Sequence, residues 1–260
     1  MKKIVAHLLI SSVLCLCINP QTGNSQNSSK TDNTTDHKMP AKAQTPESET
    51  LLKSKTNLQG IDISAYQPHV DWSKVKEDNI SFVFIKATGG RTYVDPSFKQ
   101  HWASAGKADM MKGAYHFYYT KDTPEAQADF FISTVKSGYT AQDLPPVLDI
   151  ETDGVNTVIT KEELQKDILT FLSLVEKAFS RKPIVYTSYA FAQEYLDDPK
   201  FSNYYLWIAE YDTNQPNVPD AWKSISWTFW QNSPSAVVTG VQGKVDHDFF
   251  KGSMDALKNL

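Results

Sequence analysis

The sequence of 260 residues predicts an α/β fold organised as a barrel of eight strands. Eight short apolar runs have the composition of buried strands, and helical patterns separate the early ones. After Pro183 the helical segments become short or weak, while strand-like runs continue. Alternation of strand and helix indicates a mostly parallel sheet, and eight strands favour its closure. A doubly wound open sheet is the alternative, but no glycine-rich phosphate loop follows a strand, so its nucleotide-binding version has no support.

The predicted strands are short and rich in β-branched and aromatic residues, which suit a sheet covered on both faces. In chain order they lie at 60–63, 81–87, 112–117, 146–151, 183–187, 205–209, 226–231 and 241–245. Helices are predicted at 95–108, 123–135 and 160–180, and each begins at residues that commonly cap helices. In the longest, Thr160 stands three residues before Glu163, which is the capping-box pattern, and apolar side chains recur at helical spacing.

The N-terminal part of the chain is predicted to lie outside the barrel. Residues 1–18 combine two lysines with an apolar run, which is typical of a signal peptide or a lipoprotein leader. Residues 19–58 are rich in Asn, Ser, Thr, Gln, Lys and Pro, and they predict a disordered polar linker. The barrel then occupies residues 59–260. We therefore expect an exported protein that is secreted, periplasmic or lipid-anchored to the bacterial envelope.

Cysteine use and charge exclude several kinds of site and partner. Both cysteines, Cys15 and Cys17, lie in the leader, so the folded part has no disulfide, thiolate metal site or catalytic cysteine. Lipidation of either cysteine and simple secretion both stay open. The net charge of −4 and the lack of a basic stripe argue against nucleic acid. No apolar run is long enough for an integral membrane span, and we expect a monomer with no cofactor.

Two carboxylates follow the fourth predicted strand and point to hydrolytic chemistry. The run Pro145 to Glu151 is apolar until Asp149 and Glu151, which stand one residue apart. Side chains two positions apart on a strand share a face, so these acids project together. Paired carboxylates are the usual machinery of glycoside hydrolysis. The simpler alternative is a strand end that meets a solvated loop.

Further polar side chains gather at the ends of other predicted strands. Asp62 lies on the first strand and Asp246 follows the eighth, and these two strands are neighbours in a closed barrel. The resulting set of four acids strengthens the interpretation of Asp149 and Glu151 as an active site. Several aromatic or amide side chains suit a sugar-binding site near them. These candidates are Tyr115, Tyr186, Tyr211, Trp230 and Gln231.

Other residues receive structural interpretations. We expect His116 to be a hydrogen-bonded support rather than a catalyst, and Trp207 and Trp227 to be core aromatics. Alternation along the strand sends His247 to the face opposite its two flanking acids, so no metal site is expected there. No serine stands in a nucleophile elbow, which argues against Ser-His-Asp hydrolysis.

With these residues identified, the domain resembles glycoside hydrolase family 25, the muramidases also called Chalaropsis-type lysozymes. The resemblance covers nearly all of residues 59–250 and depends on many motifs in the same order. They include Gly60-Ile61-Asp62-Ile63-Ser64, Lys86-Ala87-Thr88, Gly113-Ala114-Tyr115-His116-Phe117, Pro146-Val147-Leu148-Asp149-Ile150-Glu151, Trp230-Gln231 and Val245-Asp246.

The resemblance implies an irregular TIM-like barrel with eight strands and fewer helices. It also implies cleavage of the β-1,4 bond between N-acetylmuramic acid and N-acetylglucosamine in peptidoglycan glycan strands. By position, Glu151 matches the general acid, and Asp149, Asp62 and Asp246 match the other active-site acids. Like charges nearby would raise the pKa of Glu151, while Asp149 stays ionised and either orients the substrate's acetamido group or stabilises the oxocarbenium-like charge. Substrate assistance, direct nucleophilic attack and inversion through water all stay open.

The chain departs from the family pattern at three places. Gly89 stands where the family usually has Glu, Pro68-His69 where a Gly is common, and Asp248 where Asn is frequent. These differences bear on substrate preference more than on activity. Two other functions remain as alternatives: a cell-wall-binding module with impaired catalysis, and a chitinase-like N-acetylglucosaminidase.

Overall fold

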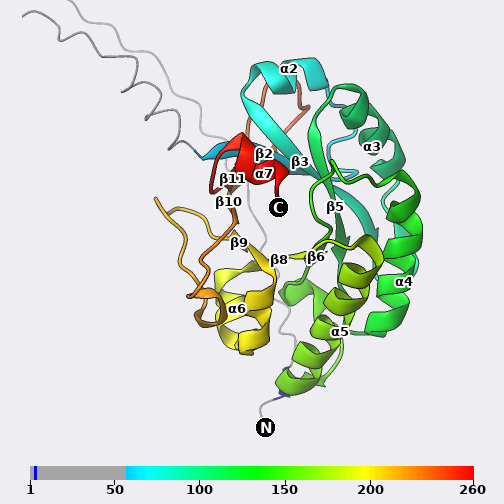
Figure 1. Ribbon diagram of the computed structural model, residues 1–260, viewed down its shortest axis with the longest axis vertical. Coiled ribbons are helices and arrows are strands. Elements are labelled where there is room, and N and C mark those ends of the chain that lie inside the picture. Colours follow the sequence, from blue (N-terminus) through cyan, green and yellow to red (C-terminus); the bar gives the residue numbers. More distant parts are fainter. Residues whose placement is uncertain (1–2, 5–56) are drawn as a thin grey trace, which may run out of the picture. The chain divides into compact units, whose positions relative to one another are not determined.

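The computed structural model describes residues 3–4 and 57–260, and its core is a closed barrel of eight strands (Figure 1). The strands follow one another around the barrel in the order β2-β11-β10-β9-β8-β6-β5-β3, and pairing of β2 with β3 closes the circle. Their bounds are β2 Leu58–Ile63, β3 Ile80–Gly89, β5 Met111–Phe117, β6 Val147–Asp149, β8 Ile184–Ser188, β9 Tyr205–Ala209, β10 Phe229–Ala236 and β11 Val245–Phe250. The predicted α/β barrel is therefore confirmed.

The eighth strand differs from its prediction in place, and it is the antiparallel strand of the barrel. It begins at Val245, where 241–245 was predicted, because Gly240 and Gly243 adopt left-handed backbone angles (φ 94° and 90°) that turn the chain there. β11 then runs antiparallel to both of its neighbours, β10 and β2, whereas the other barrel strands are parallel to one another. The barrel is mixed, and its last strand enters from the opposite end.

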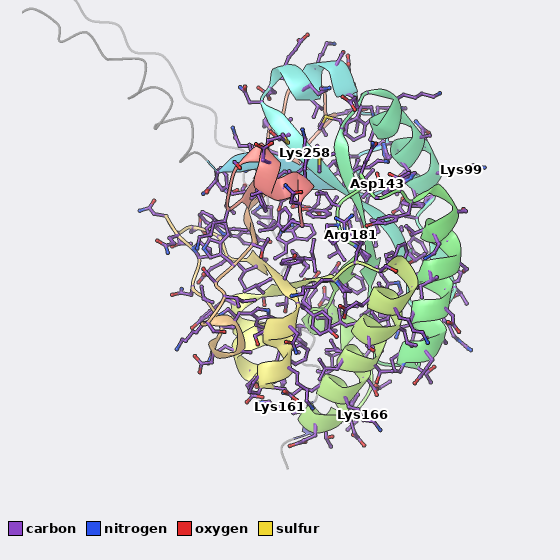
Figure 2. All side chains as sticks on the ribbon, in the orientation of Figure 1. Lys99, Asp143, Lys161, Lys166, Arg181 and Lys258 are labelled. Carbon is purple, nitrogen blue, oxygen red and sulfur yellow. The ribbon has the colours of Figure 1, made fainter. Side chains whose placement is uncertain are left out.

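Six α-helices lie among the described residues, fewer than the strands of the barrel (Figure 1). The predicted three are α3 Phe98–Lys107, α4 Pro124–Val135 and α5 Lys161–Phe179; α2 Trp72–Glu77, α6 Tyr189–Tyr195 and α7 Met254–Lys258 are shorter. The capping box predicted for α5 is present, because the Thr160 hydroxyl accepts from the Glu163 backbone and Glu163 accepts from the Thr160 backbone. Figure 2 shows α5 extending from Lys161 at its start to Arg181 beyond its end.

Two apolar layers hold the barrel, one inside it and one between the strands and the helices. Large aromatic side chains such as Phe82, Phe84 and Phe229 fill the interior. Glycines on adjacent strands make room for them: a Cβ at Gly60 would lie 2.2 Å from the Phe82 ring, and one at Gly113 would lie 2.6 Å from Phe84. Alternation along each strand therefore assigns side chains either to the barrel interior or to the outer layer.

The C-terminal helix closes the end of the barrel at which the parallel strands begin. Leu257 of α7 is fully buried in the interior cluster, and the Arg181 guanidinium donates to the Leu260 carbonyl at 2.9 Å. An ion pair between Lys112 and Asp143 lies near this end, since Lys112 is the second residue of β5. The opposite end stays open for a site.

Short elements complete the description. β4 Tyr93–Val94 pairs with the end of β3, and β1 Lys3–Ile4 pairs with β7 Ile159–Thr160. Apart from these two residues of β1 and the last two residues before Gln59, the expected leader (1–18) and linker (19–58) lie outside the described residues, as do Cys15 and Cys17. In the part of the chain that the structure describes, no helix has the length and apolar character needed to cross a membrane.

Candidate active site

A cavity of about 250 Å³ opens at the end of the barrel where the parallel strands finish. All four acids predicted for the site, Asp62, Asp149, Glu151 and Asp246, line it. Tyr115, Tyr186, Tyr211 and Gln231 also line it, so eight of the nine predicted site residues converge on one cavity. Sequence distance is no obstacle to this convergence, because neighbouring strands bring their ends to a single rim.

Asp62 and Asp246 form one side of the cavity. They are direct register partners across the antiparallel β2–β11 pair, which places their Cβ atoms roughly 4.5–5.5 Å apart. The prediction put Asp246 after the eighth strand, and that is wrong. Asp246 is the second residue of β11, and it reaches the same rim because β11 runs in the reverse direction.

Asp149 and Glu151 form the other side. Asp149 ends β6, and the backbone stays extended through Glu151, whose φ and ψ are −144° and 175°. The Ile150 amide donates to the Tyr186 carbonyl at 3.0 Å, which continues the pairing with β8 beyond the last strand residue. Extended backbone explains why both acids face the cavity while Ile150 is buried in the outer layer.

Gln231 links three side chains of the cavity wall by hydrogen bonds. Its side-chain oxygen accepts hydrogen bonds from the Tyr186 hydroxyl at 2.8 Å and the Tyr211 hydroxyl at 2.5 Å. Its amide nitrogen donates to Asp62 Oδ2 at 2.7 Å. Both ends of the Gln231 amide are thus assigned by their partners, and the network fixes the orientation of one acid and two phenols.

Trp230 is the predicted site residue that the structure does not bring to the cavity. It is 6% exposed, packs against Trp227 and Phe249, and donates its indole N–H to the Glu210 carbonyl at 2.7 Å. Gln231 next to it points into the barrel, so alternation turns Trp230 outward. Neighbouring residues on one strand cannot both line the same cavity.

The structural interpretations of the other aromatics can be compared with their places. Trp227 is buried on the outer face of the barrel, as expected. Trp207 is a core residue stacked on Phe84, and it also contributes to the cavity wall. His247 faces away from the cavity and contacts Asn232 and Gln59. Among the described residues, no cluster of three or more His, Cys, Asp or Glu has metal-binding geometry.

His116 is a buried support, as the sequence predicts. Its Nε2 lies 3.2 Å from Gln127 Oε1, and its Nδ1 lies 2.8 Å from the Thr88 hydroxyl. Gln127 Oε1 already accepts the Tyr119 amide, so Nε2 must carry the proton and Nδ1 accepts from Thr88. Burial lowers the pKa of His116 to about 3, so the ring stays neutral. It holds Gln127, whose amide nitrogen donates to the carbonyls of Tyr119 and Asp122 and so fixes that loop.

The sequence interpretation missed Lys86 as a site residue. Its ammonium lies 4.7 Å from the centre of the Phe117 ring and 5.8 Å from that of Tyr115, and it lines the cavity beside the acids. The signal was available, because Lys86 interrupts the second predicted strand, which is otherwise apolar, near its carboxyl end. Ser64, Tyr66 and Phe117 complete the wall.

Burial dominates the electrostatics of the four acids. It is the largest cause of a raised pKa at each one, followed by Asp246 for Asp62 and by Glu151 for Asp149 and Asp246. The pKa of Asp246 rises to about 6. Lys86 lowers the pKa values of Asp62, Asp149 and Glu151. Acids with raised pKa values are suited to hold a proton near neutral pH.

The Asp149 and Glu151 carboxyls influence each other's protonation. After burial, the charge of Glu151 is the next largest cause of the raised pKa of Asp149, and Asp149 Oδ1 is buried without a hydrogen-bond partner among the described residues. The sequence interpretation assigned the proton to Glu151 and the charge to Asp149. Burial raises the pKa values of both carboxyls, so small changes in their contacts can move that proton.

A barrel with paired carboxyls at one rim is an architecture of glycoside hydrolases. Residues 61–241 match the family model described as Glycosyl hydrolases family 25. This match spans more than half of the sequence, and the chain belongs to that family, the Chalaropsis-type lysozymes or muramidases.

Relatives of known sequence or structure agree with this assignment. The chain is 34% identical over 212 residues to the uncharacterized protein YegX of Escherichia coli K12, a match that covers 80% of this chain and 74% of YegX. It is 32% identical over 224 residues to lysozyme M1 of Streptomyces globisporus, covering 83% and 75% of the two chains. The crystal structure of a bacterial lysozyme from Streptomyces coelicolor superposes with a TM-score of 0.73 at 32% identity, covering 79% of this chain and 97% of that one.

Proposed function

We propose that the protein is a peptidoglycan muramidase that cleaves the β-1,4 bond between N-acetylmuramic acid and N-acetylglucosamine. The observation that carries this proposal is the cavity in which the Asp149–Glu151 pair faces the Asp62–Asp246 pair. Family membership supports a glycan substrate. A related protein that matches over most of its length is named a lysozyme.

Glu151 is proposed as the general acid that protonates the leaving oxygen. For that step Glu151 must carry a proton while Asp149 is ionised, and burial raises the pKa values of both carboxyls. An acetamido N–H donated to Asp149 would stabilise the ionised form of that carboxyl and leave the proton on its neighbour. Binding of the substrate would then favour the protonated form of Glu151, whereas binding of a sugar without an acetamido group would not.

The acetamido oxygen of the substrate is proposed to attack the anomeric carbon. Asp149 and Glu151 stand two positions apart on extended backbone, which places their Cα atoms roughly 6–7 Å apart, and this spacing is compatible with attack by the acetamido group. Asp149 would hold the acetamido group, and Tyr115 and Tyr186 would orient it from adjacent strands. Retention of configuration follows, and NMR detection of the first-formed anomer tests it.

Replacing Glu151 with Gln tests the assignment of the acid. Gln keeps the size of the side chain but cannot donate the proton, and loss of a general acid typically lowers the rate 10²- to 10⁴-fold. Release of soluble muropeptides from purified cell walls, followed by mass spectrometry, measures the effect. Glu77→Gln is the matched control, since Glu77 is exposed on α2 and far from the cavity. A Glu151→Gln protein with full activity would refute the proposal.

Product analysis distinguishes the two alternative functions. A muramidase leaves N-acetylmuramic acid at the new reducing end, whereas an N-acetylglucosaminidase leaves N-acetylglucosamine. Release of sugars from chitin but not from cell walls would favour the chitinase-like alternative. Binding to peptidoglycan without turnover would favour a wall-binding module, although all four acids line the cavity.

Export to the cell envelope is also part of the proposal, and it rests on the sequence of residues 1–18. Fractionation of the producing cell distinguishes secretion from lipid anchoring. Substitution of Cys15 and of Cys17 by Ser, one at a time, identifies which of them, if either, carries the lipid.

A further inference from the structure

A second groove adjoins the proposed active site and is not needed for bond cleavage. It has a volume of about 580 Å³ and shares Ser64, Tyr66, Lys86 and Phe117 with the catalytic cavity. Beyond these shared residues it extends over Gly89 and Gly90 to Tyr93, Tyr119 and Lys121. A substituent on a sugar held in the cavity could enter this groove directly.

The acids of the groove already have partners. Asp122 forms an ion pair with Arg91 at 3.1 Å and accepts the Arg91 amide at 3.2 Å. Asp95 accepts the amides of Ala65 and Ser97 and the Ser97 hydroxyl. These hydrogen bonds direct both carboxylates toward the protein rather than toward a ligand.

The two lysines of the groove are different. Among the described residues, neither Lys86 nor Lys121 has a carboxylate within ion-pair distance. Each ammonium lies instead over an aromatic ring, Lys86 at 4.7 Å from the Phe117 centroid and Lys121 at 5.0 Å from the Tyr119 centroid. Lys121 therefore offers a positive charge to a ligand in the groove, Lys86 offers a second one where the groove meets the catalytic acids, and the exposed rings of Tyr66 and Tyr93 flank them.

Gly89 adds no negative charge to the groove. A Cβ at this position would meet Tyr119, Tyr93 and Phe117 at 3.5–3.7 Å, which is ordinary contact, so a side chain would fit and would project among these residues. An acid there would neutralise the nearby lysines. The bare backbone leaves the cationic character intact.

We propose that this groove binds the carboxylates of the peptide attached to the lactyl group of N-acetylmuramic acid. This inference rests on the proposed muramidase function, because it requires a muramic acid in the adjoining cavity. The peptide departs from the sugar ring at its lactyl ether, next to the bond being cleaved. Lys86 and Lys121 receive its carboxylates, and Tyr66, Tyr93 and Tyr119 cover its backbone. The enzyme then prefers peptide-bearing strands with free carboxylates.

The test compares two tetrasaccharides that differ only in charge. Both carry alanyl-glutamate on each lactyl group, and in the second compound the glutamate carboxylates are primary amides. We expect the wild type to have a kcat/KM roughly two- to five-fold higher for the acid form, the range that a partly exposed ion pair provides. The preference should shrink in 0.5 M salt, because screening weakens exposed charges.

Paired variants separate charge from size. Lys121→Met and Gly89→Glu should each bring the ratio of the two rates close to one, while Lys121→Arg and Gly89→Gln should keep it. Rates on the amide compound should stay unchanged in all four variants, since these positions lie outside the catalytic cavity. A merely structural role for either residue would lower both rates together.

Two results would overturn the inference, and they differ in what else they refute. Equal wild-type rates on the acid and amide compounds would refute the carboxylate site and leave the muramidase function intact. The same holds for a preference that survives both Lys121→Met and Gly89→Glu. Failure to cleave either compound would refute the proposed function, and the inference would fall with it.

Discussion

Replacing Asp246 with Asn should stabilise the protein at neutral pH while it impairs activity. Burial, followed by the charge of Glu151, raises the pKa of Asp246 from its ordinary value of 3.8 to about 6. Between these two values the folded protein binds more protons than the unfolded chain, so this group's contribution to stability falls as pH rises. Above pH 6 the loss is complete, and below pH 4 it is absent.

The magnitude follows from the difference between the two pKa values. A difference of about 2 corresponds to roughly 3 kcal/mol at 1.36 kcal/mol per pKa unit. Asp246 is only partly buried, and solvent screening reduces this to about 1–2 kcal/mol. Asn removes the charge, so the variant should gain that amount at pH 7.5. For a domain of this size the gain corresponds to an increase in Tm of roughly 2–8 °C.

Urea unfolding of wild type and Asp246→Asn at pH 7.5 and at pH 4 measures the effect. The stability difference should be present at the higher pH and vanish at the lower one. A double-mutant cycle with Glu151→Gln should give a smaller gain for Asp246→Asn, because the repulsive partner is already neutral. A variant that is less stable than wild type at pH 7.5, or equally stabilised at both pH values, would contradict the reasoning.

Two further predictions concern residues of the cavity wall. Lys86→Met should move the pH–activity profile to higher pH, because Lys86 lowers the pKa values of Asp62, Asp149 and Glu151. A profile that stays in place or moves to lower pH would show that Lys86 does not act on these acids. Tyr211→Phe should raise KM or lower kcat, since the Tyr211 hydroxyl donates to Gln231 in the cavity wall. Trp230→Phe should leave both constants within about two-fold, because Trp230 lies outside the cavity. Cell-wall turnover by each variant measures the contrast.

The sequence predicted the parts of the fold that depend on local patterns. Seven strands and the three longer helices lie close to their predicted places, since apolar runs and capping residues determine them locally. The eighth strand was misplaced because Val245 to Phe250 carries three polar residues in a row, Asp246, His247 and Asp248. The sequence alone does not show which of these polar residues faces the interior, because the neighbouring strands determine which face of β11 is interior.

The candidate site was predictable where one strand carried two carboxylates on one face. Asp149 and Glu151 are such a case, and extended backbone through Glu151 keeps them together. Trp230 and Gln231 are the opposite case, since adjacent residues face opposite sides and only Gln231 reaches the cavity. Lys86 was overlooked because a single lysine in an apolar run resembles a solvated strand end. Its place beside four carboxyls depends on closure of the barrel, which local sequence does not encode.

Closure of the barrel also assembles one half of the acid cluster. Asp62 comes from the first barrel strand and Asp246 from the last, and they meet only when β11 pairs with β2. Because the last strand is antiparallel, its first residues lie at the rim that carries the acids. Asp246 therefore follows closely after the turn that contains Gly240 and Gly243, at the beginning of β11 and not at its end. Pairing of β2 with both β3 and β11 thus closes the barrel and brings Asp62 and Asp246 together. Substitutions that weaken this seam should reduce activity before they unfold the helical side of the barrel.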